Sequence, residues 1–454
     1  MKEINNAGKA AVPEEFLELT GKNLSIDPAK YEKYNVKRGL RNSDGTGVLV
    51  GLTVIGEVHS YIFDDNEKVD VPGRLLYRGI DVPDIVRACE SENRFGFEEV
   101  IYLLLFGTLP TTAQLDRFSK YLSQFRTLPE NFTEDTILKA PSKDIMNKLA
   151  RSVLAMYSYD DDPDNIELGN LLRQSFQLIA SFPTMTAYAF QAKAHYYDSK
   201  SLVIHAVRED MSIAESFLHL MRPDSSFTEE EAKILDLCMI LHAEHGGGNN
   251  SAFTTHVVSS SGTDTYSAIS AAIGSLKGPK HGGANNKVMG MMAEIKEQVK
   301  DWTSEEELSE YIRKIVRKEA YDCLGLIYGF GHAVYTISDP RTELLKERAR
   351  SLAEKKGKTD EFELYNLVEK LAPIIFAEMK NQSKPLPANV DFYSGFVYSL
   401  LDIPPDLYTP IFAMSRIVGW CAHRIEEVMT STRIIRPAYK SVSKRSGYVP
   451  IKER

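Results

Sequence analysis

The chain has 454 residues, of which 43% are hydrophobic and 26% charged, and its formal net charge at pH 7 is −9. These proportions are typical of a globular protein and exclude a wholly disordered or collagen-like chain. The acidic balance argues against a general nucleic-acid-binding protein. No stretch approaches the roughly 20 apolar residues that span a bilayer, and the first residues lack the apolar core of a signal peptide, so we expect a cytoplasmic protein.

Strand-like sequence is confined to the early part of the chain. Residues 48–55 and 57–63 are rich in β-branched and aromatic side chains, which predicts a small N-terminal β-hairpin. Residues 97–106 form an apolar helical run that is too hydrophobic for the surface, so we expect a helix in the core.

Helical signals dominate the rest of the chain. Thr228–Glu231 is a predicted capping box before a helix that ends at residue 242, and Ser304–Glu307 is another. Thr409 and Pro410 have the residue types of an N-cap and a first helical position, which predicts a helix to about residue 428. The sequence therefore predicts a helix-rich fold.

The sequence argues against three kinds of generic site. Gly357–Thr359 ends like a phosphate-binding P-loop but lacks the glycine five residues before it, and Gly329–Gly331 lacks the third glycine of a dinucleotide fingerprint. His242–Glu244 matches half of a zinc deaminase signature, but the cysteine half is absent from the chain. The four cysteines lie far apart in sequence. We therefore expect neither a metal site nor a disulfide framework.

Three histidines lie beside glycines where helical sequence breaks off, at His245, His281 and His332. Glycine lets a ligand approach the backbone closely, and a histidine in a loop suits proton transfer near neutral pH. The alternative is that these glycines only terminate helices. The remaining histidines lack such surroundings and are interpreted as ordinary core or surface residues: His59, His195, His205, His219, His256 and His423.

Asp391 precedes an apolar helical run, so it has the position of an N-cap residue. The functional alternative is a carboxylate base that the helix N-terminus keeps ionised. Such a base would be weak and would need help at the carbonyl of its substrate.

Three arginines lie in uncharged surroundings, at Arg341, Arg416 and Arg436. A guanidinium on an apolar stretch needs an anion, which is either an acidic side chain of the same protein or a bound carboxylate or phosphate.

Six blocks between about residues 74 and 437 resemble, in family order, the signatures of the citrate synthases. They are Arg74–Gly79, Phe97–Pro110, Leu241–Ala252, Gly278–Asn285, Gly329–Arg341 and Asn389–Gly395. Two features depart from the family pattern, namely Lys280 before His281 and the proline-rich residues 385–388. The first 70 residues carry little family signal.

The resemblance implies an all-α, citrate-synthase-like two-domain fold that forms a homodimer or a larger homo-oligomer. Residues 1–281 and 397–454 would form the large helical domain, and residues 282–396 a small one that closes over the active site. The implied reaction condenses acetyl-CoA with oxaloacetate and hydrolyses the thioester to citrate and CoA, without a metal or other cofactor. Two alternatives stay open: a 2-methylcitrate synthase that uses propionyl-CoA, and an inactive CoA- or dicarboxylate-binding protein of the same fold.

The resemblance also implies roles for individual residues. Asp391 would remove the methyl proton, His281 would stabilise the enolate, and His332 would polarise the ketone of oxaloacetate. Oxaloacetate would be bound by His245, His332, Arg341 and Arg416, and by Arg436 reaching into the site of the neighbouring subunit. CoA would be bound by Leu326, Ile327, Tyr328, Gly329, Gly331 and Asn389.

Overall fold

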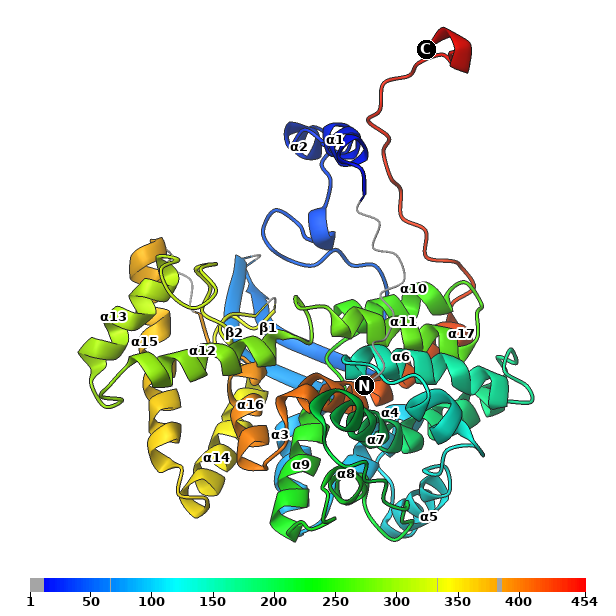
Figure 1. Cartoon of the computed structure of the whole chain (residues 1–454), viewed down its shortest axis with the longest axis vertical. Coiled ribbons are helices and arrows are strands. Elements are labelled where there is room, and N and C mark those ends of the chain that lie inside the picture. The colour runs from blue at the N-terminus through cyan, green and yellow to red at the C-terminus, as the bar shows by residue number, and fades with distance from the viewer. Residues whose placement is uncertain (1–11, 66, 333, 382–385) are drawn as a thin grey trace. The chain divides into compact units, whose positions relative to one another are not determined.

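The computed structural model describes residues 12–65, 67–332, 334–381 and 386–454. The chain divides into two compact units, one of Met1–Leu52 with Arg436–Arg454 and one of Thr53–Ile435. The second unit contains the helices α3 to α17 that are labelled in part in Figure 1. The domain boundaries that the family resemblance implies, at residues 281/282 and 396/397, stay a prediction.

The smaller unit has short helices and many exposed side chains. Its helices are α1 (Glu14–Asn23) and α2 (Ala29–Lys33), with 3₁₀ turns at Arg38–Leu40 and Ile451–Glu453. The Arg38 guanidinium lies 4.6 Å from the centre of the Tyr31 ring, and the Lys440 ammonium lies 5.8 Å from that of Tyr34.

The sheet of the larger unit is antiparallel and consists of β1 (Gly56–Asp64), β2 (Glu67–Tyr77) and the short β3 (Ile80–Asp81), with Gly56 opposite Tyr77. A hairpin is therefore present near the predicted place, but the prediction for one of its two strands is wrong. Residues 48–55 form no strand, and the partner of β1 is β2. Leu75 and Tyr77 of β2 are buried, whereas Leu52 is 90% exposed, so the apolar run before β1 packs no face of the sheet.

A buried helix organises the first half of the larger unit. This helix, α7 (Leu168–Asp198), spans 31 residues and is buried along most of its length, with Pro183 inside it. Against it pack α5 (Thr112–Ser123), α6 (Ile145–Met156) and α8 (Ile213–Met221), while α4 (Phe97–Phe106) packs on α5 and α3 (Val82–Ser91) on β2 and β3. The boundaries of α4 agree with the predicted core helix, and Phe97 is fully buried.

The loops that carry His245 and His281 adjoin four helices that meet at α17. They are α9 (Glu229–His242), α10 (Asn250–Ser259), α11 (Thr265–Lys277) and α17 (Tyr408–Thr430). Helix α17 packs against α7, α9, α10 and α11, and its Trp420 is fully buried. Burying such a large apolar side chain fixes the position of the helix, and with it the polar residues that the helix carries.

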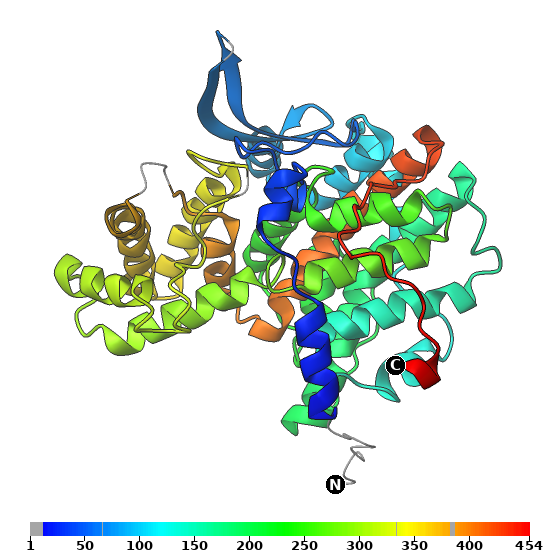
Figure 2. The same ribbon diagram turned by 90° about the horizontal axis from the view of Figure 1, so that it is seen from above.

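A further set of helices lies to the left in Figure 1 and again in Figure 2. It consists of α12 (Ala284–Gln298), α13 (Glu305–Val316), α14 (Pro340–Lys355), α15 (Thr359–Lys380) and α16 (Val390–Leu400). These helices pack largely on one another, α14 and α12 on α16, and α13 on α15. A 3₁₀ turn at Pro405–Leu407 then leads into α17.

The predicted helix starts are confirmed in part. Thr228 and Glu231 form the full capping box of α9. Ser304 caps α13, but Glu307 binds the backbone N–H of Lys300 at 2.7 Å instead of completing a box. Thr409 is not an N-cap, because α17 begins at Tyr408 and the Thr409 hydroxyl donates to the carbonyl of Gly282 at 3.0 Å.

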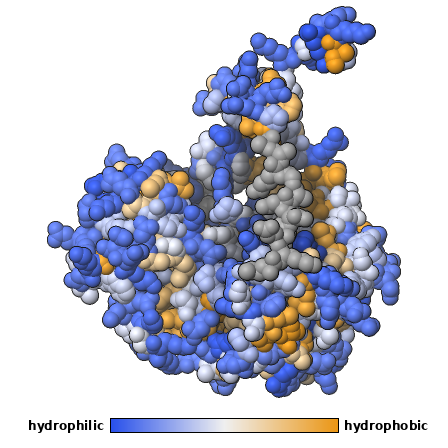
Figure 3. Space-filling model, in the orientation of Figure 1, coloured by the Kyte–Doolittle hydropathy of each residue, from blue (hydrophilic) through white to orange (hydrophobic). Residues whose placement is uncertain are grey.

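Among the described residues, no helix has both the length and the apolar character needed to cross a membrane. The face of the molecule in Figure 3 is mostly hydrophilic, with separate hydrophobic patches. This surface agrees with the acidic composition of the chain.

Candidate functional site

The three glycine-flanked histidines come from three loops that meet in the larger unit. His245 follows α9, His281 lies between α11 and α12, and His332 precedes α14. The ring centres of His245 and His332 are 5.0 Å apart, and the Tyr335 ring lies 5.5 Å from the first and 4.6 Å from the second. Burial lowers the pKa of both His245 and His281, and the charge of Arg416 contributes to both shifts, so these two histidines lie near the same arginine.

The backbone fixes the tautomer of His332. The N–H groups of Val334 and Tyr335 both point at its Nδ1, each at 3.0 Å. A backbone N–H can only donate, so Nδ1 must be an unprotonated acceptor. A neutral His332 therefore carries its proton on Nε2, and Nε2 is the atom that can donate to a substrate oxygen.

His281 is held by a serine. Its Nε2 lies 2.9 Å from the hydroxyl oxygen of Ser251, near the start of α10. Burial, helped by the charge of Arg416, lowers the pKa of His281 to about 4. The ring is therefore neutral at pH 7 and can act as a hydrogen-bond donor or acceptor rather than as a cation.

Two polar atoms at the site are buried without a hydrogen-bond partner among the described residues. They are Nε2 of His245 and Nη2 of Arg416. Burial and the nearby arginines hold the pKa of His245 well below its ordinary value, so this imidazole is neutral. An unsatisfied buried polar atom costs about 1–3 kcal/mol, which is typical of a site that a ligand completes.

Arg416 is fixed from two sides. Its Nε donates to the carbonyl of His242 at 2.7 Å, and the guanidinium lies 4.9 Å from the centre of the Phe412 ring, one turn earlier on α17. Burial lowers the pKa of Arg416 to about 10, which still leaves it protonated at neutral pH. A cation held in this way supplies a fixed positive charge.

Arg341 has an internal acidic partner. Its Nε and Nη2 donate to the two carboxylate oxygens of Asp339 at 3.0 and 2.7 Å, and both side chains are buried. Although burial alone would lower the pKa of Arg341, Asp339 raises it. The pair leaves Nη1 for other contacts. Both readings of this arginine, an internal acid and a substrate anion, thus remain compatible.

Asp391 is not the N-cap of α16, which corrects one reading of the sequence. The cap is Asn389, whose Oδ1 accepts from the backbone N–H of Asp391 at 3.1 Å. Asp391 lies inside the first turn, so its carboxylate has no capping duty. Desolvation raises the pKa of Asp391 to about 6, although Arg341 and Arg416 pull it down. Burial therefore outweighs the helix N-terminus, and the carboxylate is a stronger base than the sequence suggests.

The residues predicted to bind CoA lie on a loop that is tied to the start of α16. The backbone N–H of Asn389 donates to the carbonyl of Gly329 at 2.8 Å, and its side-chain amide donates to that of Gly331 at 2.9 Å. Gly329 has a φ of +83°, and a Cβ there would lie 2.8 Å from Phe392. Leu326 is half-exposed, whereas Ile327 is buried and the Tyr328 hydroxyl donates to Asp322 at 2.6 Å.

These contacts give Gly329, Gly331 and Asn389 a structural task, namely holding the loop beside Asp391. Their role in binding CoA stays a prediction. Arg436 is exposed and belongs to the smaller unit, so its predicted reach into a neighbouring site also stays a prediction.

Sequence reasoning missed two residues of the site. Ser251 orients His281, and the Asn-Asn-Ser run gave no sign that its hydroxyl would reach a ring 30 positions away. Asp339 pairs with Arg341, and here a signal existed, because an aspartate two residues before a buried arginine can form a local ion pair.

Chemically, the arrangement combines fixed cations with neutral imidazoles and a raised carboxylate. Arg341 and Arg416 would attract a small carboxylate-bearing molecule, and the imidazoles can hydrogen-bond its carbonyl. The Asp391 carboxylate can accept a proton at neutral pH. Together these groups suit proton abstraction next to a carbonyl.

A family model for the citrate synthase C-terminal domain matches residues 44–438. Over 426 residues the chain is 33% identical to a citrate synthase of Haloferax volcanii, and the alignment covers 92% of this chain and 99% of that protein. It is 34% identical over 386 residues to a 2-methylcitrate synthase of Shewanella oneidensis, covering 84% and 92%.

The fold has a solved counterpart in the citrate synthase of Thermoplasma acidophilum, described as a ternary complex with carboxymethyl coenzyme A and oxaloacetate. The TM-score is 0.73 at 27% sequence identity, and the match covers 92% of this chain and 99% of the other.

Removing the Asp339 charge should destabilise the protein strongly. An Asp339→Asn variant leaves the Arg341 charge buried without its counter-ion, so we expect the free energy of unfolding to fall by about 3–5 kcal/mol. Urea denaturation followed by circular dichroism measures it. Glu310→Gln is the matched control, because Glu310 pairs with Arg317 at the exposed surface and should matter little. Equal stability of the two variants would contradict the buried ion pair.

Proposed function

The chain belongs to the citrate synthase family, and from this we propose that its histidine site condenses acetyl-CoA with oxaloacetate and hydrolyses the product to citrate and free CoA. The chain is an acyltransferase of the citrate synthase type. The residue roles, the second substrate and the assembly state below are parts of the proposal.

The observation that carries the proposal is a pair of buried polar atoms, Nε2 of His245 and Nη2 of Arg416, that have no hydrogen-bond partner among the described residues. Arg341 lies close enough that its charge lowers the pKa of His245. A dicarboxylate such as oxaloacetate would satisfy both orphaned atoms and neutralise the two arginines at once. Such bidentate, charge-assisted contacts are the strong ones, which favours a dianion over a neutral ligand.

Asp391 would serve as the base. Its carboxylate takes a proton from the methyl carbon of acetyl-CoA, and the electron pair of that C–H bond moves to the thioester oxygen. The raised pKa makes this carboxylate a better proton acceptor than an exposed aspartate, while most of it stays ionised at pH 7. Binding of a dianion would push the pKa further up by charge repulsion.

His281 would stabilise the enolate. Because the ring is neutral, it can donate one hydrogen bond to the thioester oxygen, from Nδ1 when the Ser251 hydroxyl donates to Nε2 in place of Oδ1 of Asn249, which lies 3.0 Å from that hydroxyl. Preorganised donors at the position where negative charge develops are typically worth 10²- to 10³-fold in rate. Ser251 would then be a positioning residue that selects the tautomer.

His332 would act on the ketone of oxaloacetate. Its Nε2–H polarises the carbonyl, the enolate carbon bonds to the carbonyl carbon, and the new alkoxide takes the Nε2 proton. The proton that Asp391 has taken up then replaces it, so that the imidazole ends neutral. Water then cleaves the thioester, which releases CoA. The reaction needs no metal or other cofactor in this scheme.

The remaining assignments follow the family. His245, Arg341 and Arg416 would bind oxaloacetate, and Leu326, Ile327, Tyr328, Gly329, Gly331 and Asn389 the CoA. We propose a cytoplasmic homodimer or larger homo-oligomer in which Arg436 completes the neighbouring site.

A 2-methylcitrate synthase is the second candidate, since one of the relatives carries that name. The two acyl-CoA substrates differ by one methylene, worth only about 1–3 kcal/mol in a pocket. The inactive binding protein has less support, because the groups assigned to the chemistry, Asp391, His281 and His332, are all present.

The base should give the reaction an acidic limb. Because Asp391 must be ionised, we expect kcat/KM to fall as the pH drops below about 6, where the carboxylate protonates. Asp391→Asn should lose roughly 10²- to 10⁴-fold in kcat at pH 8. Asp406→Asn, which removes a surface carboxylate paired with Lys193, should keep the wild-type rate and profile. An Asp391→Asn variant with full activity would exclude this base.

The choice between acyl donors can be measured directly. Release of the CoA thiol is followed with oxaloacetate and either acetyl-CoA or propionyl-CoA. We expect kcat/KM to favour acetyl-CoA by tenfold or more, which corresponds to about 1.4 kcal/mol of transition-state binding. A ratio near one or below would assign a 2-methylcitrate or dual synthase, and no thiol release would support the inactive alternative.

The shared site can be tested by mixing subunits. Arg436→Ala and Asp391→Ala proteins should each be nearly inactive, and reassembled mixtures should recover part of the wild-type rate. Recovery arises because a hybrid contains one site with both an intact Arg436 and an intact Asp391. Mixtures that stay as inactive as their parents would show that Arg436 does not act across subunits.

A further inference from the structure

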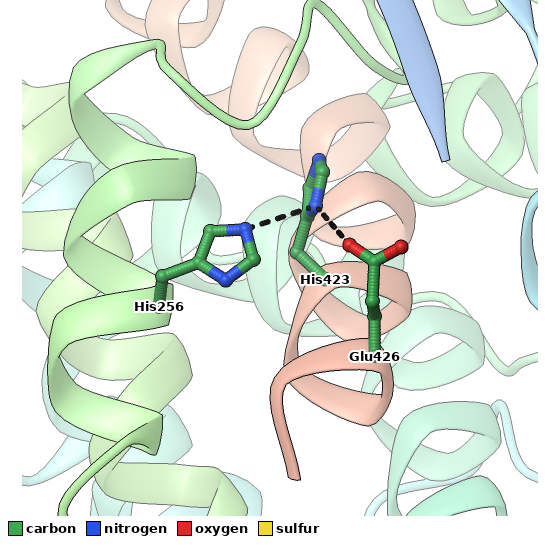
Figure 4. A group of neighbouring side chains, drawn as sticks. All are labelled: His256, His423 and Glu426. Carbon is green, nitrogen blue, oxygen red and sulfur yellow. Dashed lines mark hydrogen bonds and ion pairs between the residues drawn. The ribbon is translucent and has the colours of Figure 1, made fainter. Parts of the chain in front are cut away.

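Two histidines that the catalytic scheme does not use face each other behind the first glycine-rich loop. Nε2 of His256, on α10, lies 3.1 Å from Nδ1 of His423, on α17. The carboxylate of Glu426, one turn further along α17, lies 3.6 Å from the same Nδ1 (Figure 4). From the sequence alone, both histidines are expected to be ordinary core or surface residues, although His423 and Glu426 have the i, i+3 spacing of neighbours on one helix face.

The other nitrogen of each imidazole is held by a carboxylate. Nδ1 of His256 lies 2.8 Å from Glu427, and Nε2 of His423 lies 2.9 Å from Glu244. Histidines that bind metals nearly always have this arrangement, in which an outer carboxylate fixes the ring and increases the basicity of the inner nitrogen. Two such carboxylate–imidazole units pointing at one spot are uncommon in an ordinary core.

One carboxylate oxygen of Glu426 makes no hydrogen bond among the described residues. Its Oε1 accepts from the backbone N–H of Val54 at 2.7 Å, whereas Oε2 is buried with no hydrogen-bond partner among the described residues. Oε2 is the oxygen that faces His423. A buried carboxylate oxygen without a hydrogen bond is costly, and a cation would satisfy it.

The spacing of the three inner atoms suits a small cation. In a tetrahedral site with bonds of about 2.0–2.1 Å, ligand atoms lie about 3.3 Å apart. The two separations of 3.1 and 3.6 Å bracket this value, and all three atoms lie within 4.8 Å of one another.

The local charges favour a divalent cation. Three carboxylates, those of Glu244, Glu426 and Glu427, contact the two imidazoles. Arg416 and Arg78 are the cations whose fields reach Glu244 and Glu426. A divalent cation between the two rings would offset the negative charge of these carboxylates.

From this geometry we propose that His256, His423 and Glu426 bind a divalent transition-metal ion, with Zn²⁺ as the best match, at a site separate from the catalytic one. Two imidazoles and a carboxylate form a ligand set that Zn²⁺ uses, with a fourth position left for water. His256 and Glu427 keep 13% and 11% of their side-chain surface exposed, so the site can be reached from solvent.

The ion would support the loop that carries His245. A Cβ at Gly247 would lie 3.2 Å from the His256 ring and 3.3 Å from that of His423, so the glycine loop packs directly on the two imidazoles. Glu244, the residue before His245, also contacts Nε2 of His423 at 2.9 Å. The metal would therefore stabilise this part of the fold and take no part in the chemical steps.

Metal content tests the proposal. The full-length chain without a histidine tag is treated with EDTA, freed of it, and equilibrated with micromolar Zn²⁺ before the bound metal is measured by mass spectrometry. We expect about one ion per chain, and at least tenfold weaker binding for His256→Gln and for Glu426→Gln. The matched control is His195→Gln, since His195 is exposed near the end of α7, where its Nδ1 lies 2.8 Å from the carbonyl oxygen of Lys200. This control should bind like the wild type.

Two further readouts separate binding from misfolding. Co²⁺ in place of Zn²⁺ should give the visible absorption of a four-coordinate site in the wild type and not in the two variants, whose circular dichroism should match the wild type. Zn²⁺ should raise the melting temperature of the wild type alone. The proposal is overturned if the wild type takes up no zinc, or if His256→Gln and Glu426→Gln take up as much as His195→Gln.

Discussion

The candidate site depends on one buried carboxylate, that of Asp339. It pairs with Arg341, caps the first turn of α14, and accepts the backbone N–H of Val390 at the start of α16 at 3.3 Å. One side chain thus joins an arginine to the helix that carries Asp391. Taking two charges out of water is expensive, so this interaction holds only while both partners stay in place. The Asp339 contacts therefore also fix the position of the Arg341 cation relative to the helix that carries Asp391.

The sequence predicted the elements whose signals are local. The core helix from Phe97 to Phe106 and the capping box of α9 were confirmed because apolar periodicity and capping depend on nearby residues. The expected partner of β1 is wrong, because the segment that pairs with β1 is decided by burial against a core whose residues come from elsewhere in the chain. The prediction that Asp391 caps α16 is wrong, because Asn389, two residues earlier, also carries a side-chain oxygen that can accept from the first helical N–H groups.

The site shows a similar division. Residue types in loops identified His245, His281 and His332, and the structure brings them together. Their protonation states depend on burial and on the folded backbone, which residue types alone do not reveal. Burial makes His281 neutral, and two backbone amides choose the tautomer of His332. Pairing between His256 and His423, 167 positions apart, was likewise invisible in the sequence.

Helix α17 carries Arg416 and His423 two turns apart, and Gly419 lies between them. A Cβ at Gly419 would lie 2.3 Å from the Glu244 carboxylate and 2.6 Å from the carbonyl of Ala243. The helix and the loop after α9 therefore touch backbone to backbone. In evolutionary terms, change at this contact is restricted: a larger residue at position 419 would move the buried Arg416 and the paired His423 together, so these positions are expected to covary rather than to change one at a time.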